Sequence, residues 1–230
     1  MKKDIAFFIM VLMSFFSNSC TENNKGKTSV YQEIITSSNI DVQKKKFDIE
    51  KYELNIKKDP SYEGYWKDKN TYIKQYHIIK DGYVEETYTK DLVESYVEEI
   101  IKNDRYRDVY TFDKTGSLQS VKHYFGSNLE IGKWLYYKKD VIVKTENKDE
   151  NYAFTLEEVL KYGKTQKVDF TKTGEISKTT QSGVHVWELD WNTGKISEDG
   201  ESYLFKKVIL DGNTGKEIST KEYYSHPFVR

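Results

Sequence analysis

Few residues in this chain have the type and spacing that catalysis or metal binding requires. The histidines are His77, His123, His185 and His226. None of them forms a His-x-His or His-x-x-x-His pair, so a local metal site has no signature. Cys20 is the only cysteine, which excludes an intrachain disulfide and a zinc knuckle. No Gly-x-Ser-x-Gly or Ser-x-x-Lys motif is present. We therefore predict no enzyme activity, no metal and no cofactor.

Adjacent carboxylates are the next candidates for chemistry. They occur at Glu85-Glu86, Glu98-Glu99 and Glu157-Glu158. A glycosidase needs two carboxyl groups that face each other across a cleft, whereas neighbouring residues on a strand point to opposite faces. We expect these pairs to be solvated edges.

A calcium-like loop and a histidine among tryptophans also have simple structural explanations. Residues 211–215, Asp-Gly-Asn-Thr-Gly, begin like a calcium loop with Glu222 at its twelfth position. Lys216 occupies the place of the invariant glycine at position six, so we expect a hairpin turn. His185 alternates with Trp187 along one strand-like segment, which favours packing over metal ligation.

Aromatic residues are the one excess, at 15% of the chain. In sheets with little aliphatic core, Tyr can act as a core residue, because its ring packs against neighbours while its hydroxyl stays in water. Tyr and Trp are also enriched at protein interfaces, and they suit stacking on sugar rings. If a recognition surface exists, we expect it among Tyr65, Trp66, Trp134, Tyr136, Tyr137 and Trp187.

The charge balance excludes one class of partner. There are 36 Lys and Arg against 37 Asp and Glu, which gives a formal net charge of −1. A balance so near zero supplies no global attraction to nucleic acid. A hydrophobic content of 37% is enough to bury a core, so a folded chain is expected.

The N-terminal residues resemble a targeting segment. Lys2 and Lys3 precede an apolar run over residues 5–16, and small polar residues then lead into Cys20. This arrangement resembles a bacterial lipobox, which implies cleavage after residue 19 and lipidation of Cys20. An ordinary signal peptide with an incidental cysteine is the alternative. Thr21 stands where inner-membrane retention signals place Asp, so the outer membrane is favoured. Residues 20–46 are polar and predict a tether.

Beyond the tether the chain predicts hairpins. Apolar or aromatic residues alternate with charged ones, which is typical of sheets with one face in water. The turn signature Thr-Gly recurs at residues 115–116, 173–174, 193–194 and 214–215, and Asp81-Gly82 adds a further turn. We expect the folded part to begin near Phe47.

Two segments depart from the hairpin pattern. Residues 90–103 place apolar residues at helical spacing, although their Val, Ile and Tyr content also suits strand, and we favour a helix. Thr155 and Glu158 form a capping box ahead of a short amphipathic helix that we expect to end at Gly163. The charged residues 146–151 predict an internal boundary.

A two-stranded pattern of glycine and aromatic residues runs through residues 110–137. It includes Gly116-Ser-Leu118, Tyr124-Phe-Gly126 and Gly132-Lys-Trp134-Leu-Tyr136-Tyr137, and Tyr62-Glu-Gly64-Tyr65-Trp66 looks like an earlier copy. The pattern resembles MORN-like repeats of the toxin–antitoxin type found in bacterial lipoproteins. The resemblance implies a hairpin-repeat region over residues 47–150 that serves as a binding or scaffolding surface.

The C-terminal residues follow a different order. A helix precedes a strand that contains Trp187, and a second strand ends in Asp211-Gly-Asn-Thr-Gly215. This order is similar to PepSY-type domains, which implies a small α+β domain over residues 151–230. Such domains are typically extracytoplasmic, and inhibition of peptidases is a role proposed for them.

The sequence thus predicts a mainly β (α+β) fold, in which a twisted antiparallel hairpin array precedes a small helix-plus-sheet domain. We expect an envelope lipoprotein, anchored to the membrane, that binds another protein without catalysis. An immunity-type, antitoxin-like or peptidase-inhibiting role is the specific form of this hypothesis. The alternative is an accessory lipoprotein that binds glycan or peptidoglycan.

Overall fold

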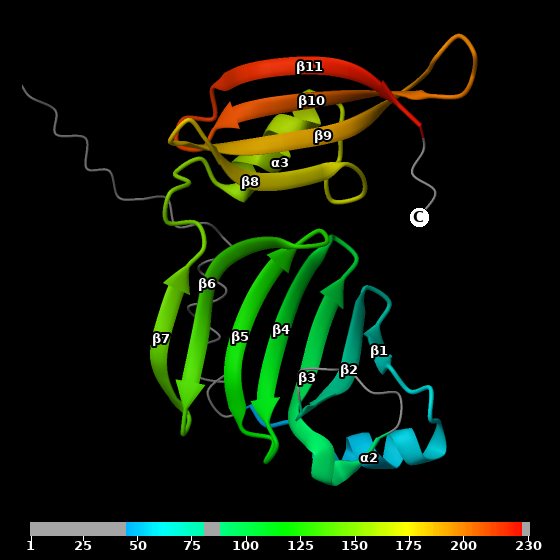
Figure 1. Ribbon diagram of the computed structural model, residues 1–230, viewed down its shortest axis with the longest axis vertical. Coiled ribbons are helices and arrows are strands. Elements are labelled where there is room, and N and C mark those ends of the chain that lie inside the picture. The colour runs from blue at the N-terminus through cyan, green and yellow to red at the C-terminus, as the bar shows by residue number, and fades with distance from the viewer. Residues whose placement is uncertain (1–44, 81–87, 227–230) are drawn as a thin grey trace, which may run out of the picture.

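The hairpins expected from the sequence build two antiparallel sheets (Figure 1). The computed structural model describes residues 45–80 and 88–226, and these form a mainly β, α+β fold. The predicted fold class is therefore confirmed. The expected signal segment, Cys20, Asp81-Gly82 and Glu85-Glu86 lie outside the described residues.

The larger sheet has seven strands, and each pairs only with its neighbours in the chain. The strands are β1 (Gly64–Asp68), β2 (Thr71–Ile79), β3 (Val93–Lys102), β4 (Tyr106–Asp113), β5 (Leu118–Phe125), β6 (Leu129–Lys138) and β7 (Val141–Asn147).

The smaller sheet has four strands in the order β11-β10-β9-β8. They are β8 (Glu175–Gln181), β9 (Val184–Ile196), β10 (Tyr203–Asp211) and β11 (Glu217–Ser225). Helix α3 (Leu156–Thr165) lies across one face of this sheet (Figure 1). Both sheets are simple meanders in which no strand skips a neighbour.

Helix α3 begins as the sequence predicts and ends later. The Thr155 hydroxyl oxygen accepts from the Glu158 N–H, and the Glu158 carboxylate accepts from the Thr155 N–H at 2.8 Å, which completes the capping box. The prediction that the helix ends at Gly163 is wrong. A Cβ at Gly163 would lie 2.4 Å from the Phe170 ring, so the glycine allows close packing inside the helix.

Helix α2 (Ile49–Lys58) was not anticipated from the sequence. Asp48 caps it by accepting from the Lys51 N–H at 3.0 Å. Tyr52 is its buried residue, and the preceding Phe47 stacks on Tyr96 of β3 with ring centroids 4.8 Å apart. The helix lies at the end of the large sheet that is remote from the small sheet (Figure 1).

Residues 90–103 form a strand, so the predicted helix is wrong. A short 3-10 turn at Lys90–Leu92 leads into β3, which pairs with both β2 and β4. Tyr96 and Val97 point to opposite faces of the sheet and are both buried. Burial on two faces gives consecutive apolar residues, which imitate helical spacing.

The four Thr-Gly signatures do not all make hairpins. Residues 115–116 and 214–215 do, in the β4–β5 and β10–β11 turns. Residues 193–194 instead lie inside β9, where the register against β10 shifts and Gly194 has a φ of +80°. Residues 173–174 precede β8 and end the connection from α3.

The two sheets share a core at their junction. Phe125, Leu129 and Ile131 of the large sheet belong to the same buried cluster as Trp187 and Val159 of the small sheet and α3. A second cluster lies against α2 and includes Phe47, Tyr52, Tyr96, Phe112 and Val121.

Two cations also cross this junction. The Lys178 ammonium of β8 donates to the Glu130 carbonyl at 3.0 Å and pairs with the Asp149 carboxylate. Burial lowers the pKa of Lys178. Arg105 donates to the Gly174 carbonyl at 2.6 Å. Both groups satisfy backbone oxygens as well as charges, so they fix how the two sheets meet.

Candidate functional site

The strand register brings aromatic and cationic side chains together on one face of the large sheet. Residues opposite each other in antiparallel strands share a face. Tyr76 is therefore on the same face as Val97, Thr111, Ser120, Tyr136 and Lys144, and Lys74 as Glu99, Val109 and Lys122. We name this surface the aromatic–cation face: Trp66, Tyr72, Lys74, Tyr76, Arg107, Lys122, Tyr124, Trp134, Tyr136, Lys144 and Lys148.

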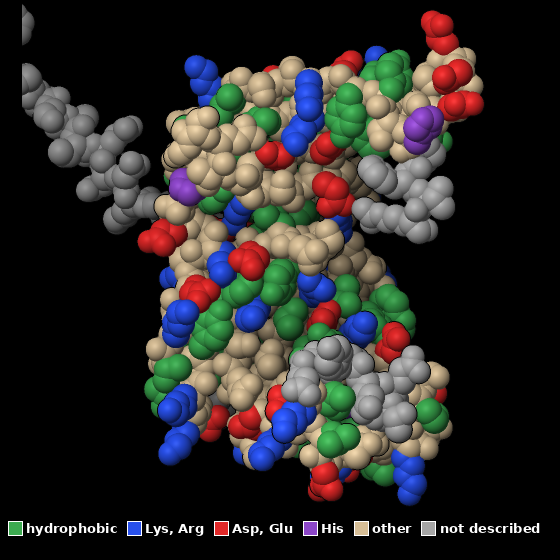
Figure 2. Space-filling view, viewed as in Figure 1, with side chains coloured by type: hydrophobic (Ala, Val, Ile, Leu, Met, Phe, Trp, Pro, Cys, Tyr) green, Lys and Arg blue, Asp and Glu red, His purple; other side chains and the backbone are tan. Residues whose placement is uncertain are grey.

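The cations of this face lie over its rings. The Lys148 ammonium is 4.0 Å from the centre of the Trp134 ring, and the Lys122 ammonium is 4.9 Å from it. The Arg107 guanidinium lies 4.9 Å from the Tyr124 ring. Figure 2 shows hydrophobic and Lys or Arg side chains side by side over the upper part of the large sheet. Each ring attracts a cation through its quadrupole.

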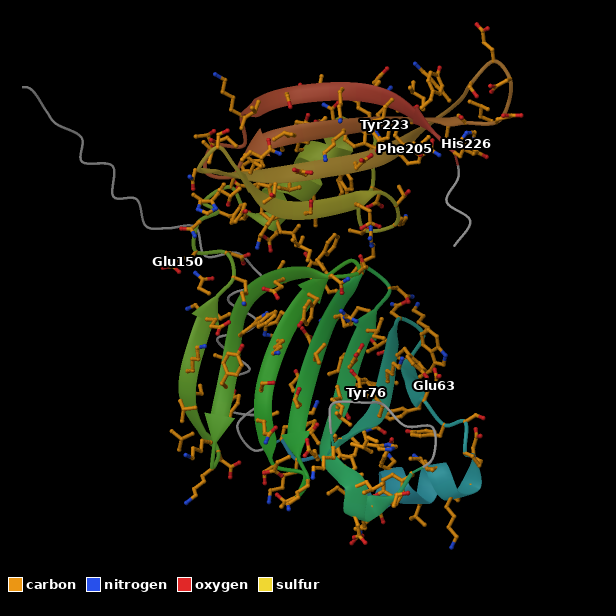
Figure 3. The ribbon with its side chains drawn as sticks, in the orientation of Figure 1. Glu63, Tyr76, Glu150, Phe205, Tyr223 and His226 are labelled. Carbon is orange, nitrogen blue, oxygen red and sulfur yellow. The ribbon has the colours of Figure 1, made fainter. Side chains whose placement is uncertain are left out.

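Two carboxylates of the face are fully engaged by its own residues. Glu99 accepts from the Tyr76 hydroxyl at 2.8 Å and lies 3.4 Å from Arg107. Tyr76 is labelled on β2 in Figure 3.

The expectation that Glu98-Glu99 is a solvated pair is wrong, because Glu99 is buried and Glu98 accepts from the Gln75 amide at 2.9 Å. Their predicted opposite orientation holds.

A second carboxylate, Glu146, sits between two lysines at the β7 edge. The Lys144 ammonium is 2.5 Å from it and the Lys148 ammonium 3.0 Å. Hydrogen bonds from these two lysines lower the pKa of Glu146 to about 2. Lys148 also contacts Glu130 at 3.1 Å. Glu146 therefore stays ionised and neutralises part of the local positive charge.

Lys74 and Lys122 differ from the other cations. Within residues 45–80 and 88–226, no carboxylate lies within ion-pair distance of either ammonium group. Both side chains are half-buried and lie near rings, Lys74 at 5.8 Å from Tyr76 and Lys122 over Trp134. The face thus offers two positive groups that the described residues do not neutralise by ion pairs.

The structure separates the aromatic residues singled out from the sequence. Trp66, Trp134 and Tyr136 are on the aromatic–cation face, with Trp66 63% exposed and Trp134 only 5%. Tyr65 and Tyr137 point to the opposite face, where Tyr137 joins the α2 cluster. Trp187 is fully buried in the small sheet and donates to the Phe154 carbonyl at 2.8 Å.

The lysines and Arg107 were missed by the sequence analysis. A signal for two of them is present, since Lys74-x-Tyr76 and Lys122-x-Tyr124 place a cation and a ring two residues apart on a strand. Side chains at that spacing share a face. Which strands then lie side by side follows from pairing, which local spacing does not encode.

The histidines and the calcium-like loop are engaged in local contacts. His185 lies 3.1 Å from the Thr180 hydroxyl and 5.7 Å from the Tyr152 ring centre. Asp211 accepts from the N–H groups of Asn213 and Thr214, as expected of a hairpin turn. The residues that the structure describes contain no cluster of three or more His, Cys, Asp or Glu side chains able to hold a metal ion.

Comparison of the chain with protein-family models, with curated proteins and with solved structures finds no match in any of the three. Among the described residues, no helix has both the length and the apolar character needed to cross a bilayer.

Proposed function

We propose that this chain is a lipid-anchored, non-enzymatic module of the bacterial envelope that binds another protein through its aromatic–cation face. The observation that carries the proposal is the row of rings and cations that extends over one face of the large sheet. Five strand spacings from β2 to β7 give a length of about 24 Å. Tyr, Trp and Arg are the residues that dominate binding energy at protein interfaces.

The position of the large sheet supports this use. It contacts α2 on its other face and the small sheet at one end, which leaves the aromatic–cation face without a covering helix among the described residues. A sheet face held by seven strands is rigid, so its side chains lose little freedom on binding. An immunity-type role is the specific form that the repeat resemblance favours, and a peptidase-inhibiting role is the form that the PepSY-type resemblance favours.

The anchor rests on the sequence around Cys20. Lipidation there would hold the module on a membrane, with the outer membrane favoured by Thr21, and residues 20–46 would act as the tether. Cys20→Ala should move the protein from the membrane fraction to the soluble fraction of lysed cells. Unchanged membrane attachment of this variant would contradict the anchor without bearing on the binding face.

Glycan binding is the second candidate function, and Trp66 is the observation in its favour. Its ring is 63% exposed and lies 5.2 Å from the Tyr72 ring, which makes a small platform on edge strand β1. Titration with soluble peptidoglycan fragments should change tryptophan fluorescence in the native chain and not in Trp66→Phe if this platform binds sugar.

Photo-cross-linking in cells tests the protein-binding proposal. A photoreactive phenylalanine derivative replaces Tyr136 on the aromatic–cation face or, as the matched control, Phe205 on the outer face of the small sheet. Phe205 stacks on Tyr223 with centroids 5.7 Å apart, and Figure 3 labels both. We expect one envelope protein to be recovered from position 136 alone. The same set of proteins from both positions would overturn the proposal.

A further inference from the structure

The chemistry that the aromatic–cation face turns outward is charged rather than apolar. The Trp134 ring lies under the ammonium groups of Lys122 and Lys148 and is only 5% exposed. A ring covered in this way does not offer its flat surface to a sugar. It holds the lysine stems in place instead, so the charges are positioned before a partner arrives.

The carboxylates on this face do not neutralise all its cations. Glu99 is engaged by Tyr76 and Arg107, and Glu146 by Lys144 and Lys148. Lys74 and Lys122 remain without a carboxylate within ion-pair distance in residues 45–80 and 88–226. Because they are half-buried on a sheet, a carboxylate brought by a partner would meet them at reduced solvent screening.

The distance between these two lysines indicates the shape of the partner. Lys74, Glu99, Val109 and Lys122 lie in one register row, so three strand spacings separate the lysines, about 14 Å. In an extended polypeptide, residues i and i+4 point to the same side and lie about 13 Å apart. An extended segment with acidic residues four apart therefore matches the row.

We propose that the aromatic–cation face binds an extended acidic polypeptide segment, with carboxylates paired to Lys74 and Lys122. The stretch between these carboxylates crosses Glu99, whose charge Arg107 offsets, and Val109, and Tyr76 and Tyr124 flank the row on opposite sides. This inference rests on the proposed function, because it names the chemistry of the partner protein. The segment crosses the strands of the large sheet rather than adding to an edge, since the row runs perpendicular to the strands.

Direct titration of the purified full chain tests the inference. The probe is a fluorescein-labelled decapeptide of alternating Glu and Thr, and the neutral probe replaces each Glu by Gln. We expect binding of the acidic probe alone, weakened strongly when the ionic strength is raised to about 1 M. Equal binding of both probes would overturn the inference.

Charge-reversal variants show which lysines bind the acidic probe. Lys74→Glu and Lys122→Glu should each weaken binding of the acidic probe about tenfold or more, because attraction becomes repulsion. Lys221→Glu is the matched control, since its ammonium also lies near a tyrosine ring, 5.7 Å from Tyr223, but on the small sheet. Lys122→Gln keeps the stem over Trp134 and should still lose affinity, which separates loss of charge from loss of folding. Equal affinity of all four variants would overturn the inference.

A uronic-acid polymer tests whether the acidic ligand of this face is a glycan rather than a polypeptide. Tighter binding of polygalacturonate than of the acidic peptide, lost in Lys122→Glu, would replace the polypeptide with an anionic glycan. Failure of the acidic probe while position 136 still cross-links one envelope protein would overturn this inference and leave the proposed function standing.

Discussion

The outer face of the small sheet and the aromatic–cation face of the large sheet carry similar residues but pair their charges differently. On the small sheet, Lys207 contacts Glu188 at 2.5 Å and the Tyr223 hydroxyl donates to Asp190 at 2.6 Å. On the large sheet, the equally half-buried Lys122 has no carboxylate within ion-pair distance among the described residues. Lys221 of the small sheet also has no carboxylate within ion-pair distance among the described residues, but its side chain is exposed. The feature that sets the aromatic–cation face apart is therefore that its unpaired lysines, Lys74 and Lys122, are half-buried.

The tryptophans give the strongest test of this comparison. Trp187→Ala should reduce the free energy of unfolding by about 4 kcal/mol, because it empties a fully buried site in the small sheet and removes the bond to Phe154. Trp66→Ala on the large sheet should cost less than about 0.5 kcal/mol. Urea denaturation followed by circular dichroism measures both. Similar losses would mean that the two rings do not differ in role.

The junction lysine gives the next largest effect. Lys178→Met should lower stability by about 2 kcal/mol, because it leaves Asp149 and two carbonyl oxygens without their donor. The loss stays moderate because Asp149 also accepts from the Gly132 N–H at 2.7 Å. Lys221→Met on the exposed face is the control, with a change within about 0.5 kcal/mol. A neutral result for Lys178→Met would show that the two sheets meet without this ion pair.

The smallest effect concerns the titration of Glu146. Its pKa in the folded chain, about 2, lies below the ordinary value of 4.5. The ion pairs therefore stabilise the fold above pH 4.5, and this contribution is lost as the pH falls through about 2. An NMR titration of the side-chain carboxyl carbons should give Glu146 a pKa near 2. The same titration of Lys144→Ala should give Glu146 a higher pKa.

The same titration sharpens the comparison between the sheets. Lys207 lowers the pKa of Glu188 on the small sheet through a hydrogen bond. Lys207→Ala should therefore raise the Glu188 midpoint and leave Glu146 unchanged, whereas Lys144→Ala should do the reverse. Movement of both midpoints in either variant would reveal coupling across the molecule.

Local sequence signals predict the helices and turns that are determined by a few neighbouring residues. The α3 capping box needs only Thr155 and Glu158, and the β4–β5 turn needs only the residues around Gly116. Helix α2 has a comparable signal in Asp48, a helix-capping residue followed by Glu50 in the first turn, and it was overlooked.

Elements that depend on pairing with other strands cannot be predicted from local sequence signals. Strand β3 has residues that suit either structure, and its pairing with β2 and β4 decides the outcome. The same holds for the candidate site. Trp66 and Trp134 both occur in Gly-x-Trp segments, yet one lies on an edge strand and the other under two lysines. The register that separates them is a property of the whole sheet.

The meander order of both sheets has a consequence for how quickly the chain folds. Every strand pairs with the strand that precedes or follows it, so each pairing encloses only the connection between two successive strands. Such connections keep the entropy of loop closure small, so a pairing does not wait for a distant part of the chain. Each strand finds its partner as soon as the next has been synthesised, and the large sheet can assemble hairpin by hairpin from β1 to β7 before the small sheet exists.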